Sequence, residues 1–483
     1  MRIPARGLPR EALFARLEQF RSRDVDWRSG RTWAYVYDAG REAEDVVKQA
    51  FTSYLCENAL DPTAFPSALR LENELIAMAA AHLGGDAEVV GSFTSGGTES
   101  IFLAVKTARD HARVHRPEIG RGQIVLPETA HAAFHKAAHY LDVEPVVVPV
   151  DPTTFRADVG AVRDAIGPRT ILLVGSAVSY AHGVVDPIRE LGALARERGL
   201  LLHVDGCMGG FLLPYLAQLG APVPDFDFRV PGVTSISMDF HKYAFAAKGA
   251  SVILYRDRAL RRHQIYACAG WSGYTVVNTT VQSTKSAGPL AAAWAVLNFL
   301  GDEGYLRLAA TMLETTRRVC AGIEGIPGLR LLGSPDMNLV AFTSDEVGVF
   351  HVVDEMRERG WFVQPQLAFN TSKENIHLSI NPAGERWVED FLADLRASVE
   401  AARALPTGEN VAALRQAVAG IDPARLSEED FAGLLGFAGV EGAALPARMA
   451  GINELMNALP PPMRSALLVE YVNQLFRQGE DAA

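Results

Sequence analysis

Short apolar runs alternate with amphipathic stretches through the middle of the chain. The apolar runs predict buried strands, and they cover residues 123–126, 145–150, 170–175, 200–205, 235–238 and 250–255. Between them, residues 99–114 and 186–197 place apolar positions at helical spacing. Strands that alternate with helices build a largely parallel sheet with helices on its faces. The pattern therefore predicts an α/β fold.

The segments on either side of this region have different patterns. Residues 9–25 predict an amphipathic helix, an aromatic-rich stretch follows, and 65–83 predict a second helix that Gly84 ends. A second α/β segment opens near residue 327, and a helical tail broken by prolines comes last. We expect four parts: an N-terminal helical and aromatic segment at 1–60, a large domain at 61–315, a small C-terminal α/β domain at 316–405 and a helical tail at 406–483.

Composition and charge narrow the function classes. The chain has 483 residues, 48% hydrophobic and 21% charged, as is typical of a globular protein with a sizeable core. A net charge of −11 argues against a nucleic-acid partner, because phosphate binding needs clustered lysine and arginine. The N-terminus lacks the apolar core of a signal peptide, and no apolar run approaches the ~20 residues that span a bilayer. We expect a cytoplasmic protein without a membrane span.

The cysteines give no sign of a disulfide framework or a metal site. The four cysteines are scattered and form no CxxC pair: Cys56, Cys207, Cys268 and Cys320. This pattern is consistent with a reducing compartment. We expect the free thiols to be buried in the fold. No cluster of cysteine and histidine has the spacing of metal ligands, so we expect no metal.

Three polar features follow one another along the predicted sheet. The turn "TSGGTES", Ser95 to Thr98, opens a helix and offers backbone N–H groups and hydroxyls that suit a phosphate. Asp205 ends the apolar strand "LLHVD", where α/β sheets place their ligands. Lys242 follows the next strand, in "SISMDFHKYAF". A lone lysine is weak evidence, because most lysines are solvated, but the three features together point to a cofactor.

The cofactor that fits this order is pyridoxal 5′-phosphate (PLP). Its chemistry needs a lysine amine to form a Schiff base, a carboxylate to keep the pyridine nitrogen protonated and a helix N-terminus to hold the phosphate. His131, at the start of the predicted helix in "AHAAFHKAA", could stack on the ring. We therefore expect a PLP enzyme that breaks a bond at the Cα of an amino substrate.

The chain resembles the group II PLP-dependent decarboxylases, most closely their sphingosine-1-phosphate lyase branch. The resemblance covers about residues 27–400, and it rests on "TSGGTESIFLAVKTARD", "AHAAFHKAA", "HVDGCMGGFLLPY", "HKYAFAAKGASVILY" and "AAAWAVLNFLGDEGY". It implies fold type I, the aspartate-aminotransferase-like fold, with a mostly parallel large-domain sheet and a small C-terminal α/β domain. It also implies a homodimer with shared active sites.

The resemblance assigns a role to each site residue. Lys242 would carry the Schiff base, Asp205 would pair with the pyridine nitrogen, and His131 would stack on the ring. The phosphate would be held by Ser95, Gly96, Gly97, Thr98 and His241, with Ser283 and Thr284 reaching the site of the neighbouring subunit. On the substrate side, Tyr37 and the second lysine, Lys248, would be joined by Asn58, Asp61 and Lys285.

Two positions depart from the lyase branch. Asp61 stands where the branch has the histidine of an Asn-Pro-Leu-His motif, and an Asp-Pro pair here resembles the archaeal tyrosine and aspartate decarboxylases. Lys285 stands where an arginine is usual, so the charge is kept and the bidentate fork is lost. A carboxylate about 4 Å from a substrate phosphate would cost roughly 4 kcal/mol at an effective dielectric of 20. Asp61 therefore argues against a phosphorylated substrate.

Several activities remain open at this point. The motifs as a whole favour a retro-aldol lyase that yields an aldehyde and an amine, and Asp61 favours an amino-acid decarboxylase. An aminotransferase would use the same aspartate and lysine and is less favoured. A non-catalytic binding protein on this fold is disfavoured, because Asp205, Lys242 and the phosphate turn are all retained.

Overall fold

Seven strands form the central sheet of the protein, which we describe from a computed structural model. Their order across the sheet is β1–β7–β6–β5–β4–β2–β3. The strands are β1 Val90–Thr94, β2 Gln123–Pro127, β3 Glu144–Val148, β4 Thr170–Ser176, β5 Leu201–Asp205, β6 Ser235–Asp239 and β7 Ser251–Tyr255. The structure describes residues 3–408, 411–418, 421–426, 428–437 and 446–476.

The central sheet is mostly parallel. Strands β3, β2, β4, β5 and β6 pair in parallel, whereas β7 runs antiparallel to both β6 and β1. All six strands predicted from apolar runs are present, which confirms the α/β class. The sequence pattern missed β1, because glycine and hydroxyl side chains in "VGSFT" leave it no continuous apolar run.

Helices cover both faces of this sheet. They are α3 Pro66–His82, α4 Gly97–His115, α5 Ala133–Leu141, α6 Val159–Ala165, α7 Ile188–Arg198, α8 Leu213–Gln218 and α9 Arg258–Arg261. Ile124 and Leu126 of β2 join a cluster with α4 and α5, whereas Val125 joins a cluster with α7 and α8. Alternate side chains of β2 therefore serve opposite faces. Gly84 ends α3 as predicted, with a φ of +64° that glycine adopts without strain.

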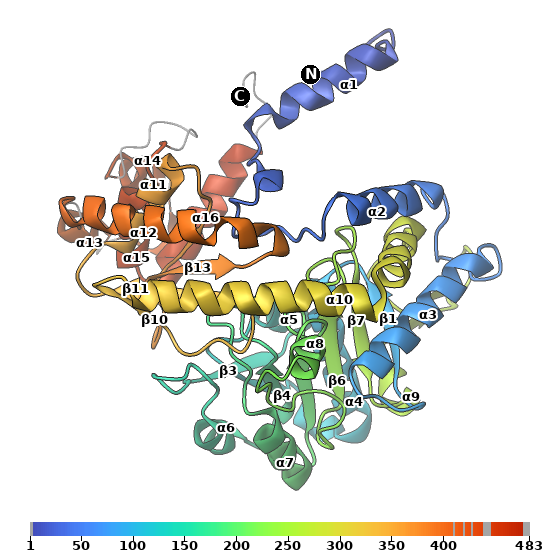
Figure 1. The fold of residues 1–483 in the computed structure, drawn as a ribbon. Coiled ribbons are helices and arrows are strands. Elements are labelled where there is room, and N and C mark those ends of the chain that lie inside the picture. The colour runs from blue at the N-terminus through green and yellow to red at the C-terminus, as the bar shows by residue number, and fades with distance from the viewer. Residues whose placement is uncertain (1–2, 409–410, 419–420, 427, 438–445, 477–483) are drawn as a thin grey trace.

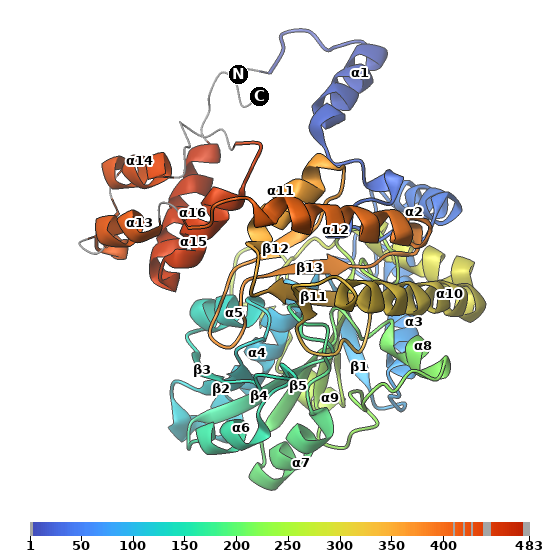
Figure 2. The ribbon, with the colours of Figure 1, turned by 60° about the vertical axis from the view of Figure 1, so that its left-hand side comes forward.

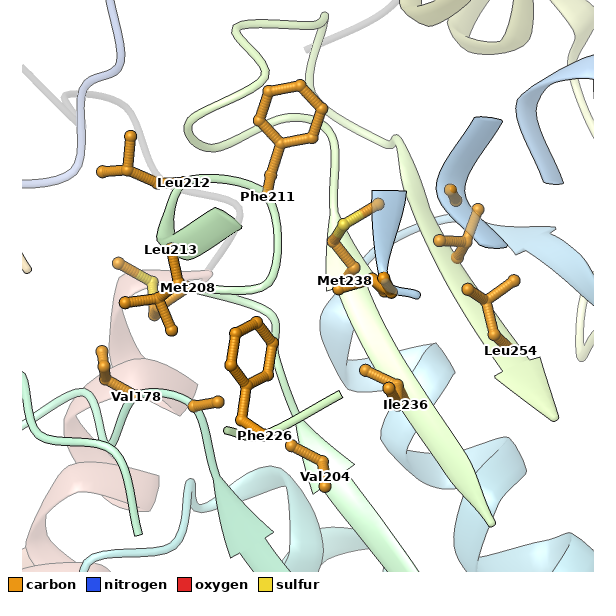
Figure 3. Packing of buried hydrophobic residues seen from close by; sticks show 14 of the residues in the cluster. Val178, Val204, Met208, Phe211, Leu212, Leu213, Phe226, Ile236, Met238 and Leu254 are labelled. Atoms are coloured by element: carbon orange, nitrogen blue, oxygen red, sulfur yellow. The ribbon is translucent and has the colours of Figure 1, made fainter. Parts of the chain in front are cut away.

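Apolar side chains pack tightly just after β5. Met208 and Phe211, which follow Asp205 closely in sequence, are each 4% exposed. In Figure 3 they lie with Phe226 beside Ile236 and Met238 of β6. This packing fixes the turn after β5 against the neighbouring strand, and so it fixes the carboxyl ends of both strands.

A long helix, α10 (Ala287–Glu324), links the central sheet to a second, smaller sheet (Figure 1). It has a kink at Gly301, whose φ of 54° lies outside the helical range. The helix contacts α2 (Arg41–Ser53), α3 and α8 as well as strands β10 and β11. The domain boundary expected at residue 315 falls inside α10, and the four-part division stays a prediction.

The smaller sheet is antiparallel, in the order β10–β11–β13–β12. Its strands are β10 Leu329–Leu331, β11 Leu339–Ser344, β12 Gln364–Gln366 and β13 Asn375–Ser379, and helices α11 Val349–Glu358 and α12 Val388–Arg403 lie beside it (Figure 2). Trp33, from the aromatic N-terminal stretch, is fully buried and stacks on Phe391 of α12 at 4.1 Å. The N-terminal segment is thus anchored to the C-terminal part of the chain.

The remaining elements lie at the edges of the molecule. They are the hairpin β8 Tyr266–Cys268 and β9 Val276–Asn278, helices α1 Arg10–Phe20 and α2 Arg41–Ser53, and the tail helices α13 Val411–Val418, α14 Glu428–Phe437, α15 Ala450–Ala458 and α16 Pro461–Leu475. The helix predicted at 9–25 is present as α1, but it buries no residue and projects from the body (Figures 1 and 2). Parts of the tail expected at 406–483 lie outside the described residues.

Within the described ranges, no helix combines the length and the apolar character that crossing a bilayer requires.

Candidate active site

A buried ion pair lies just beyond the end of β6. The Lys242 ammonium nitrogen is 3.0 Å from Oδ2 of Asp239, the last residue of the strand, and Asp239 is 2% exposed. Burial opposes the charge on Lys242, but Asp239 acts together with Cys207, Tyr37 and Asp205 to raise the lysine pKa. Burial likewise opposes the charge on Asp239, and Lys242 and His241 lower the pKa of that carboxyl. Both groups are therefore charged at neutral pH.

Asp205 ends the adjacent strand β5, and the sheet register places it opposite Ser237 of β6. Its Oδ1 accepts hydrogen bonds from the Cys207 backbone N–H at 3.1 Å and from the Ser237 hydroxyl at 3.3 Å. Asp205 is 6% exposed. Two carboxylates, Asp205 and Asp239, are thus held on neighbouring strands at the same edge of the sheet.

The predicted phosphate turn packs directly against these strand ends. A Cβ atom on Gly97 would lie 2.7 Å from the Cys207 sulfur and 2.9 Å from Oδ2 of Asp239, so only glycine fits there. A Cβ on Gly96, whose φ is 153°, would lie 3.5 Å from the His241 ring. The start of α4, His241 and Asp239 therefore surround one space.

A glutamate that the sequence analysis did not single out holds the turn in place. Glu99, in the first turn of α4, accepts hydrogen bonds from both the backbone N–H and the hydroxyl of Ser95, at 2.7 and 2.9 Å. Its other oxygen accepts the N–H groups of Val281 and Gln282 at 2.8 and 3.3 Å. The segment that carries Ser283 is thereby tied to the phosphate turn of its own chain. An acidic residue in a first helical turn was the available signal.

The two histidines assigned to the cofactor lie on different elements. His241 accepts the Ala250 backbone N–H at Nδ1, and its Nε2 is 3.4 Å from Asp239; burial lowers its pKa. His131 is exposed and precedes α5, where its Nδ1 accepts the Ala133 N–H at 3.2 Å. An exposed imidazole at this position is free to be covered by a bound ring.

Tyr37 and Lys248 form a second pair beside Lys242. The Lys248 nitrogen lies 4.5 Å from the centroid of the Tyr37 ring and donates to the His241 carbonyl at 3.2 Å. Burial raises the pKa of Tyr37 to about 12, so its phenol stays protonated. Lys248 is exposed, and partial desolvation together with the charge of Lys242 lowers its pKa to about 8. An amine with that pKa can gain or lose a proton near neutral pH.

The remaining predicted residues gather around a separate cavity of about 650 Å³, which Asp61, Ser283 and Lys285 help to line. The backbone of Asn58 pairs with that of Ser286 at its edge. Lys285 is 7% exposed and binds Glu72 at 2.6 Å, a partner that the sequence analysis missed. Lys242 is not among the described residues that line this cavity. The predicted residues thus form two groups, which Glu99 connects through the 281–282 backbone.

Asp61 also has a local role. It is exposed, and its Oδ1 accepts the backbone N–H and the hydroxyl of Thr63 at 2.8 and 2.6 Å. These bonds lower the pKa of its carboxyl and form an Asx turn before α3. The turn explains an aspartate at this position without any ligand.

The chemistry of the Lys242 group fits PLP. Among the described residues, Oδ1 of Asp239 is buried without a hydrogen-bond partner, which is unusual for a carboxylate and suits a ligand with polar atoms. The group also supplies an amine, a strand-end carboxylate and a helix N-terminus, the three parts that this cofactor requires. Fold and site together define a fold-type I PLP enzyme.

Comparison with known proteins gives the family. The "Pyridoxal-dependent decarboxylase conserved domain" matches residues 11–345, and a "Pyridoxal-dependent enzyme, C-terminal putative HTH domain" matches residues 412–474. The chain belongs to the pyridoxal-dependent decarboxylase family, and it is an enzyme with PLP as its cofactor. This confirms the predicted family, cofactor and fold class.

Individual relatives lie mostly in one branch. A sphingosine-1-phosphate lyase of Oryza sativa is 40% identical over 84% of this chain and 75% of its own. The solved structure of a sphingosine-1-phosphate lyase from Burkholderia pseudomallei is 40% identical, with a TM-score of 0.80 over 83% of this chain and 93% of its own. A probable L-aspartate decarboxylase of Pyrococcus furiosus is 33% identical over 75% of this chain and 94% of its own.

The pKa of Lys248 gives a direct test of the site's electrostatics. In protein stripped of cofactor, we expect Lys248 to react with an amine-acylating reagent along a pH profile centred near 8, because partial desolvation and the charge of Lys242 disfavour its protonated form. Replacing Lys242 with Met removes the neighbouring charge and should move the profile to higher pH. Mass spectrometry of labelled peptides reads both profiles. A midpoint near the ordinary ~10.4 would contradict the lowered pKa of this amine.

Proposed function

We propose that the protein is a carbon–carbon lyase that cleaves a phosphorylated long-chain amino alcohol by a retro-aldol reaction. Asp61 does not exclude the phosphate, because its carboxylate is exposed to solvent and already bonded to Thr63. The observation that carries this proposal is the position of the Lys248 amine, 4.5 Å from the centroid of the Tyr37 ring and close enough to Lys242 for that charge to lower the Lys248 pKa. A retro-aldol cleavage needs a base for the β-hydroxyl proton, and decarboxylation does not. The 40% identity to sphingosine-1-phosphate lyases supports the same choice.

We further propose that Lys242 carries PLP and that Asp205 keeps the cofactor's ring nitrogen protonated. When bound, PLP accepts the electron pair left at the substrate's Cα when a bond to that carbon breaks. His131 would lie on the ring. The phosphate would be held by Ser95, Gly96, Gly97, Thr98 and His241. Support comes from the packing of Gly97 against Asp239 and Cys207, which brings the start of α4 to the strand ends.

In this proposal Lys248 takes the proton from the β-hydroxyl oxygen. About one-tenth of an amine with a pKa near 8 is neutral at pH 7, against less than a thousandth for an ordinary lysine. Tyr37 stays a phenol and donates a hydrogen bond to the substrate. Cleavage of the Cα–Cβ bond then releases an aldehyde, and protonation at Cα gives the amine.

An amino-acid decarboxylase is the second candidate, because Asp61 and the similarity to a probable L-aspartate decarboxylase favour it. The aminotransferase stays a third and less favoured reading. Incubation of the pure protein with sphingosine 1-phosphate, L-aspartate and L-tyrosine separates the three. We expect a long-chain aldehyde and phosphoethanolamine by mass spectrometry. Carbon dioxide from an amino acid, or a keto acid, with no aldehyde would overturn the lyase proposal.

Replacing Lys242 and replacing Asp205 should impair the enzyme in different ways. After borohydride reduction and peptide mapping, we expect the cofactor on Lys242; Lys242→Ala should lose the covalent link and the visible colour. Asp205→Ala should keep the link but lose most of its turnover, because the ring nitrogen is no longer kept protonated. Lys248→Ala is the matched control, and it should retain the cofactor. Cofactor mapped to Lys248 instead would reverse the roles of the two lysines.

We also propose a homodimer in which Ser283 and Thr284 complete the partner's phosphate site. Both residues are exposed, and α1 exposes Leu13, Phe14 and Phe20. Mixing Lys242→Ala chains with chains carrying Ser283→Asp and Thr284→Asp tests this. Each hybrid dimer would regain one intact site, so about one-quarter of wild-type activity should return. An active monomer in light scattering, or no recovery on mixing, would refute shared sites.

We also propose that the negative charge of Asp61 weakens the binding of a substrate phosphate in the cavity that Asp61 lines. Asp61→Asn keeps the turn acceptor and removes the charge, whereas Thr63→Val weakens the turn and keeps the charge. We expect Asp61→Asn to raise the kcat/KM ratio of phosphorylated over unphosphorylated substrate by less than about tenfold, since an exposed charge is screened. Thr63→Val should leave the ratio unchanged. Equal ratios in all three proteins would make Asp61 a turn residue only.

A further inference from the structure

Three histidines meet on the surface at the far end of α4 from the phosphate turn. His111 and His115 are one turn apart on α4, and His263 follows α9. One ring nitrogen from each lies within 4.8 Å of the other two. The ring centroids are 4.3 Å apart for His111 and His115, and 5.2 and 5.6 Å apart from each of these to His263.

We propose that His111, His115 and His263 bind a divalent first-row transition ion of the zinc class. Neutral imidazole is a preferred ligand of such ions, and two histidines at i and i+4 on one helical face form a common metal-binding pair. For bond lengths of about 2.0–2.1 Å, three tetrahedral ligand nitrogens lie roughly 3.3 Å apart. The three ring nitrogens now lie within 4.8 Å of one another, and small ring rotations would bring them to this separation. The His115 ring is exposed and therefore has room to turn.

The imidazoles have no competing role in the structure. Among the residues described, no hydrogen bond from a ring nitrogen of these three histidines to another side chain or backbone group is recorded. Burial and the neighbouring imidazoles lower the pKa of His111 and of His263, which favours the neutral ligand form. A fourth position stays open to water, as at three-histidine zinc sites.

The surrounding charges are mixed: Asp110 and Asp257 favour a cation at the histidines, whereas Lys106 and Arg262 act against it. The adjacent Asp110 is held by Lys106, Arg109 and Arg113, so its carboxylate is not free to act as a ligand. The Lys106 nitrogen also donates to the His263 carbonyl at 2.8 Å, which fixes that backbone over α4. His115 is the last residue of α4, where the partial negative charge of the helix end favours a cation.

An ion at this site would join two segments that frame the proposed active site. Gln264, next to His263, donates to the Ser92 hydroxyl at 3.0 Å and to the Thr279 carbonyl. These bonds close the base of the β8–β9 hairpin, whose tip residue Tyr274 lines the 650 Å³ cavity. The ion would therefore clamp the hairpin base to α4. This role does not depend on which reaction the enzyme catalyses.

The test uses untagged holoenzyme treated with a chelator and then titrated with Zn²⁺ by calorimetry. We expect one ion per chain with micromolar or tighter affinity, and a loss of at least about 100-fold in His115→Ala and in His263→Ala. His139→Ala, which removes an exposed histidine on α5, is the matched control and should bind as the wild type does.

A second readout separates the clamp from adventitious binding. Zn²⁺ should slow hydrogen exchange at residues 264–280 in the wild type and in His139→Ala, but not in His115→Ala. Circular dichroism checks that each variant is folded; His115 is exposed, so its loss leaves the core intact. The proposal is overturned if binding is unchanged in the His115 and His263 variants, or if the wild type binds no more tightly than they do.

Discussion

The buried ion pair between Asp239 and Lys242 is the constraint around which this end of the molecule is arranged. Neither charge could be buried alone, because losing one partner of such a pair costs about 3–5 kcal/mol. The carboxylate sits at the end of a strand that is buried along its whole length. Gly97 and His241 must therefore approach it closely, and the start of α4 is drawn to the same point.

Other acids fasten the surroundings in the same manner. Glu99 ties the phosphate turn to the 281–282 backbone, and Glu72 holds Lys285 beside β1. Each is a partly buried carboxylate, and both of its oxygens accept hydrogen bonds. The lysine that replaces the arginine of the lyase branch is consequently a member of an ion pair. Its charge is already balanced within the chain, so it offers less to a substrate phosphate than a free cation would.

Much of the fold could be predicted, because buried parallel strands read as apolar runs and helices as amphipathic ones. The family motifs predicted from the sequence alone that Lys242, Asp205 and the 95–98 turn belong to one site. The sequence did not reveal the groups whose role depends on a partner far along the chain. Nothing in the local sequence pattern around Asp239, Glu99 or Glu72 indicates the partner that each has in the fold. The i, i+4 spacing of His111 and His115 was also overlooked in the prediction of no metal, because the third histidine, His263, lies on another element.

The sequence by itself determined the strand and helix pattern, the PLP cofactor and the family, because these depend on local periodicity and on contiguous motifs. The tertiary structure decided which charges are paired and which protons are held. The pKa of Lys248 is about 8 only because folding brings this exposed amine beside the charge of Lys242 and removes part of its hydration. Asp61 is a turn residue at the rim of a cavity only because Thr63 and α3 fold next to it. Electrostatics and burial depend on distances between segments, and a linear pattern does not contain those distances.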